Sequence, residues 1–542
     1  MKYTYLCLSI VLLLSSKIAV AQTAEDTTIK GSTIEIIQSY KPEVKQSAKP
    51  ALTPALPPLD TSKPNFRYDV PPQKLNYTYS PLPLQPLALT KNNSQQPFAN
   101  YVKLGGGNLS TIFLDAGIGS LQGENYKTAI HLQHLSQKGN IAGQQTSLTG
   151  MEAEGTYYKG DNAINVGVGI SRNQYYYYGY DHTVYAYDTD SLKQAFTGIH
   201  IDLGLANNQM GIKRISYQPT ISFDSYSDSR NASETSIGLN APFQYEVDST
   251  LQLFAGIYVE TNQFKNSLTS QSSNIIQFRP GINLHTNSFD LRAGINPTFG
   301  QNSSTYMLPD IEASFRVPNT QFLLNVGWQA KLLANNYRSL SGINPYMSNS
   351  FTVQQTTTNE VFAEIKSNIS NNLSFSGRAS WWEYNGLPLF VNDTLTDNKR
   401  FNILYDSKIN NLSLQASIRY QIAHTFTLGF NGRWNNFYKH SFVEVWHMPG
   451  IEFGADVAAS PIKHLTITGY LSVKDELYAL DKNNKKVKLN TIIDLGVGAE
   501  YEFIKRLSAF VNAYNLLNSG YQRWYGYDAY GMNVYGGIQL KF

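Results

Sequence analysis

Few residues of this chain have the type and spacing that catalysis or metal binding requires. His131 and His134 are three positions apart, and in an extended strand this spacing places them on opposite faces, so they cannot chelate one metal ion. The chain contains no HExxH, GxSxG or phosphate-loop pattern. We therefore expect no enzyme activity, no metal and no cofactor.

One segment, Asn173–Gln194, concentrates side chains that are suited to binding, because tyrosine rings stack on sugars and supply contact area at interfaces. For Tyr175–Tyr178 we favour a strand that continues into the aromatic girdle of a membrane barrel. Asp188 and Asp190 in this segment could contact a cation, although a solvated acidic loop is the more frequent explanation. The candidate ligand or partner residues are Tyr185, Tyr187, Asp188 and Asp190.

The elements that must position these side chains are strands. From Tyr101 onward the chain repeats, about twenty times, roughly ten to fourteen residues of period-two alternation followed by a turn. In Ile164–Ile170 the branched residues share one face, and asparagine and glycine share the other. The glycine runs Gly105–Gly107 and Gly167–Gly169 fit close strand packing better than phosphate binding. The same alternation recurs in Ile199–Leu205, Leu251–Glu260, Phe289–Asn296, Phe322–Gln329, Leu412–Tyr420, Leu465–Lys474 and Ile493–Phe503.

The connections between these strands alternate in length. The tight turns are Ser370–Asn372, Ile422–His424, Ser460–Lys463 and Ile504–Arg506. The long, polar and aromatic connections are Asn335–Val353, Asn385–Ile409, Lys439–Gly450, Asp475–Lys488 and Ser519–Tyr530. Short loops at one end and long loops at the other are typical of an outer-membrane barrel, and a propeller-like repeat is the main alternative. The pattern predicts an all-β, transmembrane antiparallel barrel of about 22 strands with both termini in the periplasm.

Composition agrees with this class. Mean hydropathy is −0.31, which is too polar for a helical membrane protein, and the 37 tyrosines suit aromatic girdles at the two membrane interfaces. The 43 lysines and arginines nearly balance the 40 aspartates and glutamates, and no long run of either sign offers a footprint for nucleic-acid phosphates. We therefore exclude nucleic acid as a partner.

Two segments precede the barrel, which we assign to 101–542. Met1–Ala21 has the charge, apolar run and small-residue site of an export signal, and it contains the chain's single cysteine, Cys7. Residues 22–100 are so rich in proline that neither a helix nor a central strand can run far. We expect this leader to be an extended periplasmic or lumenal segment without a folded plug, which could fill the wide lumen.

The last strand resembles a barrel-closing strand. Its alternate residues Val534, Ile538, Leu540 and Phe542 are apolar and share one face, and the chain ends on that aromatic residue. Together with the preceding residues this strand resembles the C-terminal signature of TonB-dependent outer-membrane receptors. The signature residues are Asn515, Leu516, Leu517, Asn518, Arg523, Trp524 and Tyr525. A faint resemblance to the coupling segment of such receptors involves Thr33, Ile34, Glu35, Ile36 and Ile37.

The resemblance implies transport of a solute across the outer membrane. The alternative is a non-transporting structural or accessory barrel in an outer-membrane protein complex. The implied partners are outer-membrane lipid and lipopolysaccharide, the barrel-assembly machinery, and either a TonB-like protein or other outer-membrane proteins. Because the proline-rich leader is shorter than the plug domain of that family, energy-coupled import is the weakest of these implications.

Overall fold

The computed structural model describes residues 100–207, 214–318, 320–422 and 425–542. The expected signal segment Met1–Ala21, residues 22–99 of the leader and the coupling segment Thr33–Ile37 lie outside the described residues. In the described part of the chain, no helix has the length and apolar character needed to cross a membrane.

The strands of the main sheet are β1 (Tyr101–Gly107), β2 (Thr111–Gln122), β3 (Tyr126–Lys138), β4 (Gln145–Lys159), β5 (Asn162–Tyr176), β6 (Lys193–Asn207), β7 (Ile215–Tyr217), β8 (Thr220–Asp228), β9 (Ser233–Glu246), β10 (Leu251–Lys265), β11 (Ser270–Phe278), β12 (Gly281–His285), β13 (Phe289–Phe299), β14 (Thr305–Arg316), β15 (Phe322–Ala334), β16 (Gln355–Ser370), β17 (Leu373–Asn385), β20 (Ile409–Ile422), β21 (Phe426–Tyr438), β22 (Ile451–Ala459), β23 (Leu465–Asp475), β26 (Ile492–Ile504), β27 (Leu507–Tyr514) and β30 (Asn533–Lys541). The connections carry the small hairpins β18 (Leu387–Asn392) with β19 (Phe401–Asp406), β24 (Tyr478–Leu480) with β25 (Lys486–Lys488), and β28 (Gln522–Trp524) with β29 (Tyr527–Asp528). They also carry the short helices α2 (Thr189–Leu192) and α3 (Tyr337–Ile343) and the single turns η1 (Gln301–Ser303) and η2 (Thr394–Thr396).

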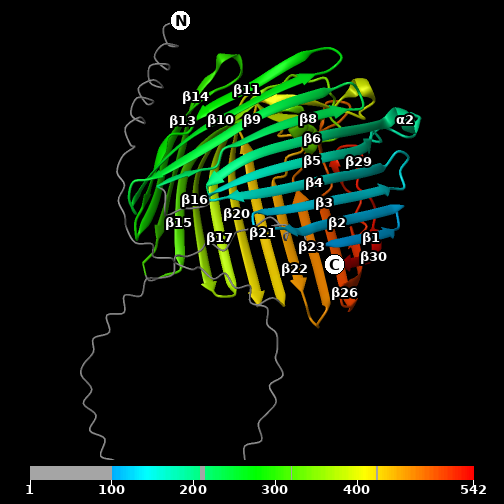
Figure 1. Cartoon of the computed structure of the whole chain (residues 1–542). Coiled ribbons are helices and arrows are strands. Elements are labelled where there is room, and N and C mark those ends of the chain that lie inside the picture. Colours follow the sequence, from blue (N-terminus) through cyan, green and yellow to red (C-terminus); the bar gives the residue numbers. More distant parts are fainter. Residues whose placement is uncertain (1–99, 208–213, 319, 423–424) are drawn as a thin grey trace, which may run out of the picture. The chain divides into compact units, whose positions relative to one another are not determined.

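These strands form one closed antiparallel ring (Figure 1). Two positions of the ring are each shared by two short strands, β7 with β8 and β11 with β12, so the ring has 22 positions. Pro219 and Pro280 stand at these two breaks, where a residue without a backbone N–H interrupts the ladder. The expected all-β barrel of about 22 strands is confirmed.

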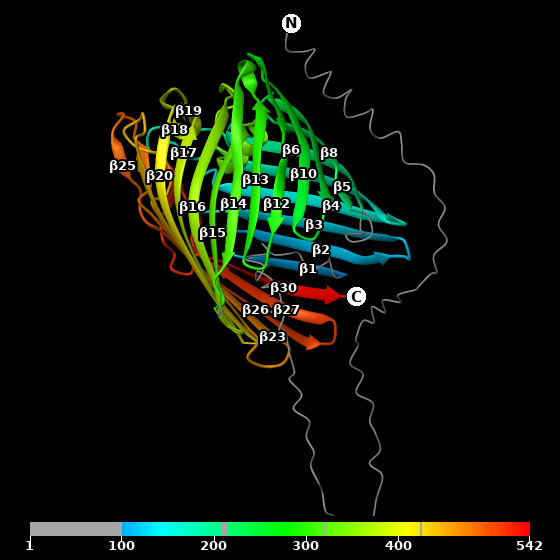
Figure 2. The same ribbon diagram turned by 90° about the vertical axis from the view of Figure 1, so that its left-hand side faces the viewer.

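The ring closes where β1 pairs with β30, and the two views show these strands side by side (Figures 1 and 2). Glycines make this close pairing possible: a Cβ built on Gly537 would lie 1.8 Å from the Leu104 carbonyl oxygen, and one on Gly107 would lie 2.1 Å from that of Val534. The Phe510 ring of β27 covers the seam and lies 5.8 Å from the Phe113 ring of β2. The glycine run at 105–107 therefore serves strand packing, as expected.

Side chains alternate between an apolar outer face and a polar inner face. On β5 the exposed side chains include Ile164 and Ile170, which are 42% and 48% exposed. On β30 Ile538 is 55% exposed, whereas Gln539 is 8% exposed and lies within 2.8 Å of the Glu500 carboxylate. An apolar outer band and a polar interior are what a strand needs when lipid lies on one side and water on the other.

The connections at the two ends of the ring differ. At the end where β1 begins and β30 ends, described turns such as 371–372 and 505–506 are short. At the opposite end lie the connections 177–192, 335–354, 386–408, 439–450, 476–491 and 515–532. All the long connections thus lie at one end, as expected, although the same end also has short loops at 108–110, 139–144, 229–232, 266–269 and 300–304.

Candidate functional site

The six long connections at one end of the barrel fold together, and we call this assembly the cap. Its centre is a mainly aromatic cluster that includes Tyr178, Tyr337, Phe401, Trp524 and Tyr527, all less than 9% exposed. These residues come from four different connections, so each loop becomes ordered only when the others are in place. The burial of so many rings makes the cap a packed unit and not a set of independent loops.

Contacts within the cap join loops that start from distant walls of the barrel. The Tyr187 hydroxyl, between β5 and β6, donates to the Asp397 carboxylate, between β18 and β19. The Tyr346 and Tyr527 rings stack with centroids 3.6 Å apart, which joins the β15–β16 connection to the β27–β30 connection. The Tyr178 hydroxyl donates to the Asp528 carbonyl oxygen at 2.8 Å. The cap therefore bridges the mouth of the barrel.

The short helix α3 attaches the cap to the barrel wall. The Glu234 carboxylate accepts hydrogen bonds from the backbone N–H groups of Tyr337 and Arg338 at 2.6 and 3.1 Å. The Tyr337 hydroxyl donates to Asp228 at 2.6 Å, and the Arg338 guanidinium pairs with Asp224. Each wall residue in these contacts belongs to β8 or β9, so one sector of the wall holds the helix.

Most of the signature residues support the β27–β30 connection. Asn515 donates to the carbonyl oxygens of Ser519 and Tyr530 at 3.1 and 2.9 Å, and Asn518 accepts from the Met532 N–H at 2.9 Å. Leu517 is 55% exposed. Leu516 donates its backbone N–H to the Leu495 carbonyl oxygen at 2.9 Å, which continues the pairing of β26 with β27.

The remaining signature residues surround a buried histidine. The Arg523 guanidinium donates to the His447 carbonyl oxygen at 2.5 Å, and the Trp524 ring lies 5.0 Å from the imidazole. The imidazole donates from Nδ1 to Phe390 O at 2.9 Å and accepts from the Tyr525 N–H at Nε2 at 3.3 Å. Burial lowers the pKa of His447 to about 3, so the ring is neutral and joins three loops.

The loop that carries the candidate tyrosines spans 177–192, because β5 extends to Tyr176 and β6 begins at Lys193. It is therefore shorter than the segment Asn173–Gln194 that the sequence indicated. Tyr185 is 41% exposed and stacks on Tyr187 with centroids 6.2 Å apart, while Lys399 Nζ lies 3.9 Å above the Tyr187 ring. Asp188 caps α2 by accepting from the Asp190 N–H at 3.2 Å. Tyr187 and Asp188 are thus structural, whereas Tyr185 and Asp190 remain exposed.

The girdle interpretation of Tyr175–Tyr178 is wrong for the rings that the cap buries. Tyr176, Tyr177 and Tyr178 are 7%, 2% and 6% exposed, and they pack against other cap residues instead of lying on the outer face. The first two tyrosines do belong to β5, as expected for a continuing strand. The chain turns inward after Tyr176, which a period-two pattern cannot show.

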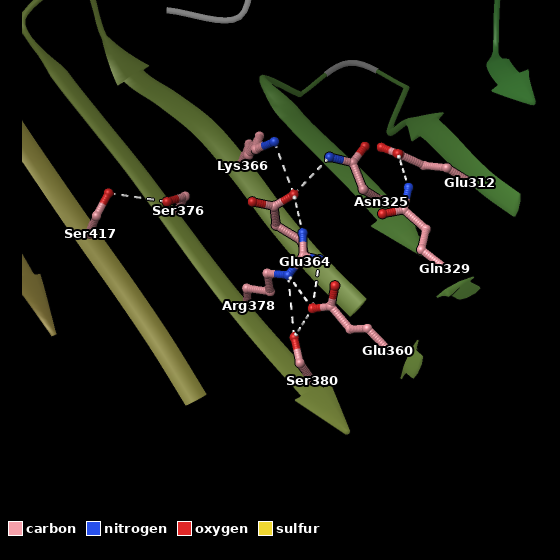
Figure 3. A network of polar contacts seen from close by, with 10 residues as sticks. All are labelled: Glu312, Asn325, Gln329, Glu360, Glu364, Lys366, Ser376, Arg378, Ser380 and Ser417. Carbon is pink, nitrogen blue, oxygen red and sulfur yellow. Dashed lines mark hydrogen bonds and ion pairs between the residues drawn. The ribbon is translucent and has the colours of Figure 1, made fainter. Parts of the chain in front are cut away.

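The inner wall carries several clusters of charged and polar groups. Figure 3 shows one sector, in which Arg378 donates to Glu360 at 2.7 Å and Lys366 lies 2.9 Å from Glu364. Asp290 pairs with Arg316, and Glu500 lies 3.2 Å from Lys103. Among the described residues there is no cluster of His, Cys, Asp or Glu with metal-binding geometry. The lumen can therefore hold water and polar solutes.

A cavity of about 610 Å³ lies where the cap meets this wall. Its lining includes Tyr258 and Glu260 from β10 together with Asn336, Arg338 and Ser339 at the start of α3. No local pattern in the sequence singles out these residues, or Glu234 and His447. Glu234 and His447 contact residues 57 to 104 positions away in the chain, so spacing gives no signal.

Solved structures of known proteins share this fold. The FrpB iron transporter from Neisseria meningitidis has a TM-score of 0.65 at 11% identity, with 83% of this chain and 82% of that chain covered. The siderophore receptor PirA from Acinetobacter baumannii gives 0.62 at 10% identity, with 82% and 79% covered. FpvA from P. aeruginosa, solved with bound pyoverdines, gives 0.61 at 12% identity, with 82% and 72% covered.

No family model matches the chain, and no curated protein is significantly similar to it in sequence. The chain shares its barrel fold with these iron transporters and siderophore receptors, which agrees with the resemblance of its C-terminal residues. These structural neighbours are transporters and receptors and not enzymes.

Proposed function

We propose that this protein is an outer-membrane barrel that admits a solute across the outer membrane, with the cap outside and both termini in the periplasm. The observation that carries the proposal is the closed ring of 22 positions with an apolar outer band and a charged inner wall. A ring of this size encloses a lumen wide enough for solutes. The similarity in fold to iron transporters and siderophore receptors supports the same class of activity.

In this proposal the cap is the gate, because its loops meet across the mouth. Cross-linking the β5–β6 connection to the β18–β19 hairpin should therefore block passage. Cys7 is the only cysteine of the chain, so cysteines introduced in the variants Tyr187→Cys and Asp397→Cys provide the only other thiols. A bis-maleimide between them joins two loops from distant walls. The matched control is the pair Asp188→Cys and Asp190→Cys, which joins positions of one loop.

The measurement is conductance of the purified full chain in planar bilayers in KCl. Cross-linking at 187 and 397 should lower the conductance, and cross-linking at 188 and 190 should leave it unchanged. A chain that conducts equally well with the cap locked would contradict gating by the cap. A chain that never conducts, whatever the state of the cap, would favour the accessory barrel.

The accessory barrel is the second candidate, and exposed apolar residues at the tips of the cap favour it. Leu395, Val443 and Val184 are 93%, 75% and 66% exposed, and such residues suit contact with another protein. Purification from membranes without cross-linking distinguishes the two candidates, since stable companion proteins support this one. Lipopolysaccharide, the barrel-assembly machinery and a TonB-like protein that engages Thr33–Ile37 remain predicted partners.

We still predict that the leader, residues 22–100, contains no folded plug domain and occupies the lumen. Deleting Gln22–Gln96 should raise single-channel conductance while the barrel stays folded. If the full chain already conducts like a wide pore and the deletion changes nothing, the leader is an external tether.

A further inference from the structure

Two arginines stack on one buried tyrosine in the cap. The Tyr177 ring is 2% exposed, and the guanidinium carbons of Arg230 and Arg400 each lie 5.0 Å from its centroid. Arg230 belongs to the β8–β9 turn, and Arg400 precedes β19 in the β18–β19 hairpin. Burial lowers the pKa of Arg230, and the neighbouring Arg400 charge acts in the same direction. The two like charges thus act on one another beside the same ring, in a partly desolvated place.

The carboxylate of Asp228, whose charge acts on Arg230, does not bond to either guanidinium. One of its oxygens accepts from the backbone N–H groups of Arg230 and Ala232 at 2.8 and 2.7 Å. The other accepts from the Tyr337 hydroxyl at 2.6 Å and from the side-chain amides of Gln194 and Asn349 at 3.1 and 3.2 Å. Neutral donors therefore saturate this carboxylate.

The donors of the two guanidinium groups are only partly used. Arg230 donates to the carbonyl oxygens of Ser191 and Lys193 at 2.6 and 3.1 Å, and its Nε is buried without an acceptor. The Nε of Arg400 is also buried without an acceptor, and no described residue forms a hydrogen bond or ion pair with its guanidinium. Both side chains are half-buried, so they remain within reach of a small ligand.

Four other described arginines stack on rings: Arg279 and Arg523 donate to neutral oxygens, whereas Arg292 and Arg378 each pair with a carboxylate. Arg292 lies 3.8 Å above the Phe254 ring and pairs with Asp310 at 2.8 Å. Arg378 lies 3.5 Å above the Phe362 ring and pairs with Glu360 at 2.7 Å. At Tyr177 neither guanidinium forms an ion pair with a described residue, and Asp228 acts on the Arg230 guanidinium only through its charge.

We propose that Arg230 and Arg400 bind an oxyanion group, a carboxylate or a phosphate, of a solute that reaches the cap. Planar guanidinium groups match the two oxygens of such a group, and a stacked ring holds them in orientation. The bound anion would also offset the repulsion between the two cations. This inference goes beyond the proposed function, because it holds for a transport barrel and for an accessory barrel alike.

Thermal unfolding of the purified full chain in detergent tests the proposal. Inorganic phosphate and succinate serve as probes, each titrated against chloride at matched ionic strength. We expect at least one probe to raise the Tm saturably, and the pair of titrations identifies the preferred group. The half-saturating concentration should rise at least about tenfold in Arg400→Gln and in Arg230→Gln.

Arg172→Gln is the matched control, since it removes the same charge from an exposed position near the end of β5, outside the cap. Arg400→Lys keeps the charge but removes the planar fork, so it should weaken binding while retaining the fold. Heat-dependent mobility on gels confirms that each variant is folded. The proposal fails if neither probe acts saturably on the wild-type chain, or if Arg230→Gln or Arg400→Lys responds exactly as the wild-type chain does.

Discussion

At the residue scale, the face that a side chain occupies on its strand decides what it contributes. Ile538 meets the apolar outer band and Gln539 meets the charged interior near Glu500, although the two are neighbours in the chain. The same alternation places His131 inside, 2.9 Å from Asp115, and pairs His134 with Thr149 at 2.8 Å. A charge is therefore tolerated at one position and costly at the next.

Arginine substitutions at 538 and 539 should differ strongly in cost. Ile538→Arg places a charge in hydrocarbon and should lower the free energy of unfolding by about 2 to 4 kcal/mol near the midplane. Gln539→Arg faces the Glu500 carboxylate and should cost much less. Denaturant titration of each variant in lipid vesicles measures the difference. Equal losses would show that the facing of β30 is misassigned.

At the scale of elements, the cap depends on hydrogen bonds between loops. The neutral His447 ring is the clearest case, since its two nitrogens satisfy one acceptor and one donor from different connections. Protonation would place a second donor against the Tyr525 N–H and a charge beside Arg523. In the unfolded cap the His447 imidazole can be protonated without these unfavourable contacts.

Acid should therefore loosen the cap through His447. The folded pKa of about 3 lies below the ordinary value of 6.5, so between these values the unfolded state binds more protons and stability falls as pH falls. The loss can approach about 1.4 kcal/mol per pH unit for this single group. The hydrogen-exchange protection factors of residues 439–450 and 515–532, corrected for the intrinsic exchange rate at each pH, should fall from pH 6.5 to 4.5.

His447→Asn is the control for this prediction, because it removes the titrating ring and keeps a polar side chain. The variant should be less stable at neutral pH and less sensitive to acid than the wild-type chain. An acid response of the same size in both proteins would assign the effect to other groups.

At the scale of the whole molecule, the barrel has two unlike ends. One end carries the turns and the chain termini of the ring, and the other carries the cap. Leu395 at the tip of the β18–β19 hairpin is 93% exposed and offers a place for insertion that disturbs little packing.

Epitope tags should show which end faces outward. A tag after Leu395 or after Val184 should be labelled by antibody on intact cells, because both positions lie on the cap. A tag in the turn 505–506 should be labelled only after permeabilisation. The opposite pattern would reverse the barrel in the membrane.

The strands can be predicted from the sequence alone, because period-two alternation and turn spacing are local properties. The sequence also predicts the apolar face of β30, close strand packing at the glycines 105–107 and long loops at one end of the barrel. The resemblance that the sequence shows at Asn515–Tyr525 agrees with the fold that the structural neighbours share.

The candidate site depends on contacts that only the folded chain makes. Tyr177 is locally the continuation of a strand, yet its ring is buried with Arg230 and Arg400 stacked on it. Tyr187 is a candidate ligand residue by its type, and in the structure its hydroxyl donates to Asp397 from another loop. Loops take their conformation from non-local contacts between distant parts of the chain, and those contacts form only after the ring has closed and brought the loops to one mouth.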